Sequence, residues 1–145
     1  MLCQSLPAAT TVGQTLGILF TCAIPANKVP KGKSLRLTTA LHAVNSGTQG
    51  VVSFIDVDGE TITSADTTAQ SDEEVWNLVI TNIGGTNFSI GGTSTANEST
   101  QAWGPAILNH PAVPWSTGWT LQIWVAFNTG TFTVNGDTFI VELID

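Results

Sequence analysis

Apolar and polar residues alternate with a period of two along most of this chain, and long helical periodicity is nearly absent. The segment WTLQIWVAF at 119–127 places Trp119, Leu121, Ile123, Val125 and Phe127 on one face. This alternation is typical of a β-strand with one buried face. Comparable runs rich in β-branched and aromatic residues occur at 15–24, 34–43, 51–57, 75–81, 86–90, 130–134 and 137–144. The pattern therefore predicts about eight short strands.

Turn signals that contain Gly or Asn separate these runs. Asn135-Gly136 is the strongest of them and predicts a tight hairpin between 130–134 and 137–144. The sequence SDEE at 71–74 matches a helix capping box, but a strand-like run follows it, so we expect a solvated loop or a single helical turn. Short strands joined by turns within one domain predict an all-β fold, an antiparallel two-sheet sandwich of jelly-roll type that spans residues 15–145.

The first fourteen residues, MLCQSLPAATTVGQ, lack this alternation. We expect residues 1–14 to form an extended N-terminal arm that has no core of its own and that orders by lying across a neighbouring subunit. The arm residues expected to make that contact are Leu2, Leu6 and Pro7.

The stretch 103–119 is rich in proline and strongly apolar, which is unusual for a connecting loop. Its large side chains lose favourable burial energy if they stay in water. Two arrangements are open: the loop folds back as a lid over the sheet, or it buries against another subunit. For the second arrangement the candidate assembly contacts are Trp103, Ile107, Leu108, Val113 and Trp115.

Charge is scarce and unevenly placed, since charged residues make up 10% of the chain. All four basic side chains, Lys28, Lys31, Lys33 and Arg36, lie in 28–36, whereas all eleven acids lie elsewhere and the net charge is −7. An acidic body argues against nucleic-acid binding. The basic stretch is either a solvated loop or an assembly contact with an acidic protein surface.

No group of residues predicts catalysis, a metal site or a cofactor. The acidic run at 56–60 fails the EF-hand pattern and fits a β-turn better. Cys3 and Cys22 do not make a disulfide framework, so we expect free thiols, with a Cys3–Cys22 bridge as the alternative. The apolar run 17–24 is too short to span a membrane. We therefore expect a protein that is not an enzyme and has no membrane partner.

Trp124 and Gln122 raise a separate possibility, because both fall on the polar face of the 119–127 strand. An exposed tryptophan ring beside an amide is the kind of platform on which sugars stack. The alternative is that Trp124 packs in the core or in an interface, as most tryptophans do.

Several segments together resemble jelly-roll proteins of tailed-phage virions. They are IPAN at 24–27, SLRL at 34–37, WNLVITN at 76–82, WTLQIWVAF at 119–127, NTGTFTV at 128–134 and DTFIVEL at 137–143. The resemblance covers about residues 15 to 145 and is greatest to capsid decoration (cement) proteins. It implies a homotrimer on the outer capsid surface of the virion that stabilises the phage head by bridging subunits of the major capsid protein, with no catalytic residues. The alternative is a tail or fibre module that binds a host-surface glycan.

Overall fold

The structure is a computed structural model that describes residues 1–5, 8–12, 17–44, 51–57, 60–67, 71–96, 99–108, 113–127 and 132–144. Eleven strands and no helix are found within these ranges. The strands are β1 (Cys3–Ser5), β2 (Ala8–Val12), β3 (Gly17–Ile24), β4 (Ser34–Val44), β5 (Val51–Val57), β6 (Glu60–Thr67), β7 (Ser71–Gly84), β8 (Asn87–Ala96), β9 (Ser99–Leu108), β10 (Trp119–Phe127) and β11 (Phe132–Ile144).

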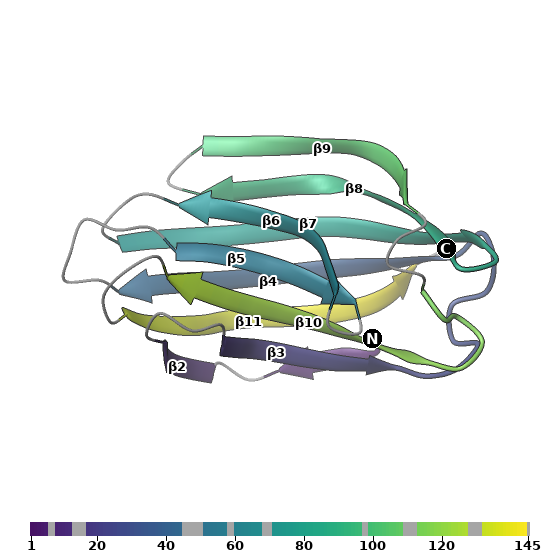
Figure 1. Cartoon of the computed structure of the whole chain (residues 1–145), viewed down its shortest axis with the longest axis horizontal. Helices are drawn as coiled ribbons and strands as arrows, with labels where there is room; N and C mark the ends of the chain where they lie inside the picture. The colour runs from purple at the N-terminus through teal and green to yellow at the C-terminus, as the bar shows by residue number, and fades with distance from the viewer. Residues whose placement is uncertain are drawn as a thin grey trace.

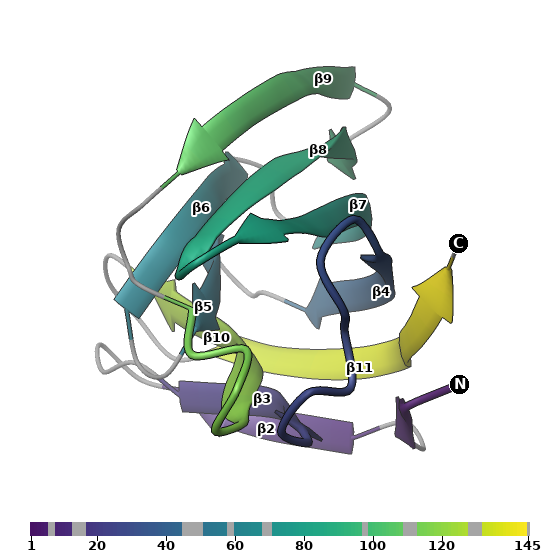
Figure 2. The same ribbon diagram turned by 90° about the vertical axis from the view of Figure 1, so that its right-hand side faces the viewer.

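The strands form two antiparallel sheets that face each other (Figures 1 and 2). The seven-stranded sheet has the order β1-β11-β4-β7-β8-β9, with β2 also paired to β11. The four-stranded sheet has the order β3-β10-β5-β6. The predicted fold class is thus confirmed as an all-β sandwich of jelly-roll-like form.

The core lies between the sheets and follows the predicted alternation. On β10 the buried residues are Trp119, Leu121, Ile123 and Val125, and on β4 they are Leu35, Leu37, Thr39 and Leu41. Trp76, Phe88 and Phe139 are the largest side chains that are fully buried. Burial of each large apolar side chain contributes roughly 1.5–3 kcal/mol, so the core supplies most of the favourable energy of folding.

The N-terminal segment differs from the extended arm that its sequence predicts. β1 pairs with β11 at Cys3↔Val141, and β2 pairs with β11 at Val12↔Phe132. Leu2 donates its backbone N–H to Val141 at 2.7 Å and packs partly against the core. Residues 3–5 and 8–12 thus pair with β11 of their own chain, whereas the sequence predicted a separate arm that orders on a neighbouring subunit. Leu6 and Pro7 lie outside the described residues.

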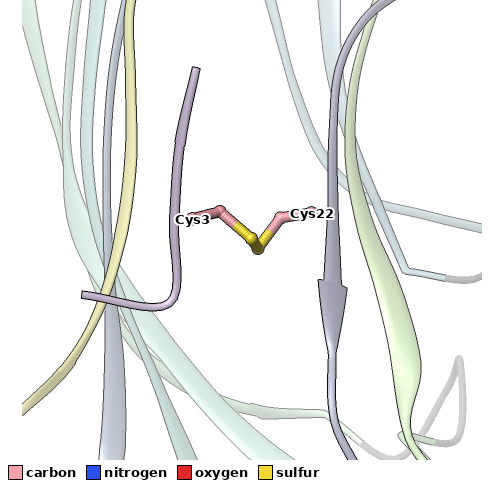
Figure 3. The surroundings of a disulfide bond; sticks show 2 residues. All are labelled: Cys3 and Cys22. Atoms are coloured by element: carbon pink, nitrogen blue, oxygen red, sulfur yellow. A yellow bond between two sulfur atoms is a disulfide. The ribbon is translucent and has the colours of Figure 1, made fainter.

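A disulfide joins Cys3 to Cys22, so the expectation of free thiols is wrong (Figure 3). The bond links β1 of one sheet to β3 of the other across a Cα–Cα distance of 5.8 Å. Cys22 is buried in the core. The two cysteines meet because β1 pairs with β11, the C-terminal strand. This pairing places Cys3 opposite Cys22 on β3 of the other sheet.

Asn135 and Gly136 do not form the predicted hairpin, because β11 runs through them as one strand. A bulge shifts its register against β4 between Gly136 and Thr138. A Cβ at Gly136 would overlap the ring of Phe20, which stacks on Phe139 with centroids 4.7 Å apart. The glycine is therefore needed for the close approach of a ring from the opposite sheet, not for a turn.

Two further segments that were expected to be loops are strands. Residues 103–108 belong to β9, an edge strand in which Gly104 and Pro105 lie opposite Gly91 at a bulge. Proline is tolerated there because an edge strand can leave one N–H side unpaired. Residues 71–74 begin β7, and Glu74 is buried rather than solvated.

The disulfide leads to a stability prediction. The bond closes a loop of 19 residues in sequence separation, for which chain entropy predicts a contribution of about 3 kcal/mol. We expect reductant to lower the free energy of unfolding of the unmodified protein, measured by urea titration, by about this amount. The variant Cys3→Ala/Cys22→Ala should have the same free energy of unfolding with and without reductant. Two reactive thiols in the native, unreduced protein would contradict the bond.

Candidate functional site

Three segments that are distant in sequence meet at one end of the sandwich, which faces the viewer in Figure 2. They are the β3–β4 loop at 25–33, the β7–β8 turn at 84–87, and residues 113–118 before β10. We call this region the loop end. A turn follows Asn82, in which Gly84 and Gly85 have φ of 106° and 64°, values that glycine adopts without strain.

Asn82 holds the β3–β4 loop on the end of β7. Its side-chain Nδ2 donates to the carbonyl of Val29 at 2.8 Å, and its Oδ1 accepts the N–H of Gly84 at 2.9 Å. Its backbone accepts the N–H of Gly32 at 2.7 Å and donates to the carbonyl of Lys33 at 3.0 Å. Asn82 is 5% exposed and Val29 is 2% exposed, so these bonds are sheltered from water.

Residues 113–118 complete the loop end. Val113 donates its N–H to Thr86 at 3.0 Å, and Asn27 donates its N–H to the carbonyl of Trp115 at 2.8 Å. The indole N–H of Trp115 reaches the carbonyl of Asn87 at 3.2 Å, and its ring meets Trp119 edge-on with centroids 5.3 Å apart. Each of the three segments therefore bonds to another.

This arrangement corrects part of the predicted assembly interface. Val113 and Trp115 are 0% and 6% exposed, because they are buried within their own chain. They therefore follow the fold-back alternative and offer no surface to another subunit. The side chains of Trp103, Ile107 and Leu108 lie outside the described residues, so their role stays a prediction.

The structure divides the four basic residues into two groups. Lys28 and Lys31 are exposed on the β3–β4 loop, and neither ammonium bonds to a residue that the structure describes. Lys33 ends the same loop and is half-buried. Arg36 instead lies on β4, 3.6 Å from Glu142, in a solvent-exposed ion pair of the kind that contributes little.

A pocket of about 360 Å³ opens among the three segments. Its floor is made by Val29, Asn82 and Trp115, which are buried. Asn27, Lys31 and Ser116 stand at its rim and bring polar groups to it.

The lysine cluster was visible in the sequence. The two asparagines were missed, and the only signals for them were the turn residues around Asn82 and the position of Asn27 before the basic run.

A second exposed feature lies on the outer face of the four-stranded sheet. Trp124 is half-buried there and donates its indole N–H to Oε1 of Gln122 at 3.1 Å. Gln122 in turn donates to the Thr21 hydroxyl at 3.4 Å. Ile18, which is opposite Trp124 in the register, is 45% exposed. The predicted outward position of Trp124 and Gln122 is thus observed, and one hydrogen bond joins the indole N–H to Gln122.

The described part of the chain contains no group of three or more His, Cys, Asp or Glu side chains placed to hold a metal ion. In the same ranges, no helix has the length and apolar character needed to cross a membrane.

Comparison with known proteins finds a weak structural likeness. No protein-family model matches the chain, and no curated protein matches it. A solved structure of a legume lectin-like domain from Entamoeba histolytica is similar over 94% of this chain and 90% of its own, with a TM-score of 0.36 and 10% identity. At that TM-score and identity, the function of this chain has to be argued from its own residues.

The role of Asn82 can be tested by proteolysis. All lysines and arginines of the chain lie in 28–36, so trypsin cuts only within that stretch. Asn82→Ala removes the bonds to Val29 and Gly84, at a cost of roughly 1–3 kcal/mol for each buried group left unpaired. We expect trypsin to cut this variant at least about tenfold faster, because local opening of the loop becomes easier. Fragment masses would report the cut sites.

The matched control is Asn77→Ala, an exposed asparagine on the same strand. It should keep the cleavage rate of the unchanged protein. Equal rates for the Asn82 and Asn77 variants would show that the Asn82 amide does not hold the loop.

Proposed function

We propose that this chain is a structural protein of a virus particle, a decoration protein on the outer capsid surface that stabilises the shell by bridging major capsid subunits. The loop end would make the contact with an acidic surface of the capsid protein. The observation that carries this proposal is the pair of Lys28 and Lys31 ammonium groups, which bond to no described residue and sit on a loop anchored in the core.

An anchored loop suits such a contact for an energetic reason. A flexible loop loses conformational entropy when a partner fixes it, whereas a loop already held by buried hydrogen bonds loses less. The bonds of Asn82 and the burial of Val29 fix the backbone between Lys28 and Lys33 before any partner arrives. The cations thus have a defined position relative to the sandwich.

The charge distribution would also orient the chain on its partner. All basic side chains lie in 28–36 and all eleven acids lie elsewhere, so an acidic shell attracts the loop end and repels the rest. Complementary charge of this kind determines the encounter rate and register more than the affinity.

The outer face of the seven-stranded sheet is suited to contacts between copies in the proposed trimer. Its described residues are mostly small or β-branched and uncharged, such as Thr38, Ala40, Val79 and Ile140, which alternate with buried positions. Two charged residues on it, Arg36 and Glu142, form an ion pair with each other. Neutral groups of this kind are less costly to desolvate than charges.

The proposal predicts that the loop lysines control attachment. Lys28→Ser/Lys31→Ser/Lys33→Ser should bind shells of the encoding virus's major capsid protein about tenfold or more weakly at low salt, with a smaller difference at high salt because salt screens exposed charges. Co-sedimentation with shells that lack the protein measures this.

The control is Arg36→Gln/Glu142→Gln, which removes a cation of the same stretch while leaving the loop intact. It should bind like the unchanged protein. If the triple variant binds normally at low salt, the loop end does not attach the chain, and if the unchanged protein ignores the shells, the capsid role is wrong.

The hydrogen-bonded Trp124 favours a second candidate function, a tail or fibre module that binds a host-surface glycan. If this function is correct, host polysaccharide should shift the tryptophan fluorescence of the protein, and Trp124→Ala should abolish the shift while the neighbouring Ile18→Ala keeps it. The reason is that only Trp124 would place its ring against the sugar. A shift that survives in Trp124→Ala would exclude this ring as the platform.

A further inference from the structure

We propose that the pocket at the loop end binds a carboxylate side chain, Asp or Glu, from an exposed acidic segment of the partner protein. This inference rests on the proposed function and deepens it, because it names the chemistry of the partner and the atoms that meet it. It separates Lys31, which lines the pocket, from Lys28, which does not.

Lys31 is positioned by the turn beneath it. A Cβ built on Gly84 would lie 3.0 Å from Cε and 3.4 Å from Nζ of Lys31, so the lysine stem lies directly on the backbone of the turn. Gly84 has a φ of 106°, which favours glycine there, and the missing side chain leaves room for the stem. The stem of Lys31 therefore lies against the turn, and its exposed ammonium stands at the rim of the pocket.

Asn27 and Ser116 bring further donors to the same rim. Asn27 has a φ of 58°, an uncommon value for a residue other than glycine, and this turns its amide toward residues 113–118. Its Nδ2 makes one long bond of 3.4 Å to the Ser116 carbonyl, which leaves a second N–H for a ligand. The Ser116 side chain is exposed and lines the pocket. An ammonium, an amide N–H and a hydroxyl around one opening are donors that suit an anion.

The floor of the pocket favours a side chain of a peptide over an acidic sugar. Val29 and Trp115 line the pocket but are almost fully buried, so they add little apolar contact area. The Trp115 ring is 6% exposed, and its N–H is already bonded to Asn87, so it offers no open face for a sugar ring to stack on. The volume of about 360 Å³ is at the lower end for small-ligand sites and accommodates an acidic side chain with part of its flanking segment.

The first test titrates an oligoglutamate peptide into the purified full chain and follows backbone amide NMR signals. We expect shifts at Asn27, Lys31, Gly85 and Ser116, and their loss in Lys31→Met. Because Lys31 lines the pocket and would make a charge-assisted hydrogen bond to the carboxylate, Lys31→Met should weaken binding about ten- to hundredfold. Lys28→Met, a matched loss of charge outside the pocket, should weaken it only a few-fold.

Asn27→Gly provides a second variant that keeps the fold, because glycine accepts the positive φ while the amide is removed. It should weaken oligoglutamate binding several-fold with an unchanged thermal midpoint. Equal losses for Lys28→Met and Lys31→Met, or shifts spread over the basic loop without Ser116 and Gly85, would overturn the pocket and leave only attraction between surface charges. Tighter binding of oligogalacturonate than of oligoglutamate would assign the pocket to an acidic sugar and overturn the inference.

The same variants on shells separate this inference from the proposed function. Loss of shell binding in Lys31→Met, with little loss in Lys28→Met, supports both. Equal loss in the two overturns the pocket while attachment through the loop end stands. Oligoglutamate binding in the pocket without any binding to shells overturns the capsid role while the carboxylate site stands.

Discussion

The side-chain amide of Asn82 is the interaction on which the loop end depends. A connecting loop cannot bury its backbone unless each N–H and C=O finds a partner. Here one buried asparagine supplies both a donor for Val29 and an acceptor for Gly84, while its own backbone pairs with residues 32 and 33. Because Asn82 belongs to β7, a strand in the middle of the seven-stranded sheet, the position of the basic loop follows from the packing of the core.

Period-two alternation predicted the sandwich because burial on one face of a strand is a local property of its sequence. The buried face of β10 is the one expected. The pattern failed where a local signal has two structural meanings. Asn135-Gly136 suits a hairpin and also a bulge, and only the Phe20 ring from the other sheet decides between them. Gly104-Pro105 likewise indicates a loop when only the sequence is considered. In the structure it lies in β9, which pairs with β8 through a bulge at this point.

What the sequence could not predict depends on contacts between distant segments. β1 and β2 lack alternation and exist because β11, at the other end of the chain, pairs with them. The Cys3–Cys22 bond follows from that pairing and not from cysteine spacing. At the loop end the lysines could be found by counting charges, but the pocket is built from residues near 27, 82 and 115 that no motif connects.

The low charge content and the clustering of the cations both suit the proposed role in an assembly. Neutral polar side chains make a surface that loses little when water leaves it, but such a surface has no preferred orientation. Clustered cations give the orientation, because they attract an acidic partner to one end only. The cations have this effect only if they keep their position relative to the rest of the surface. The buried anchors of the loop end meet that condition, so in the proposed decoration protein the sheltered hydrogen bonds and the exposed charges would be two parts of one contact surface.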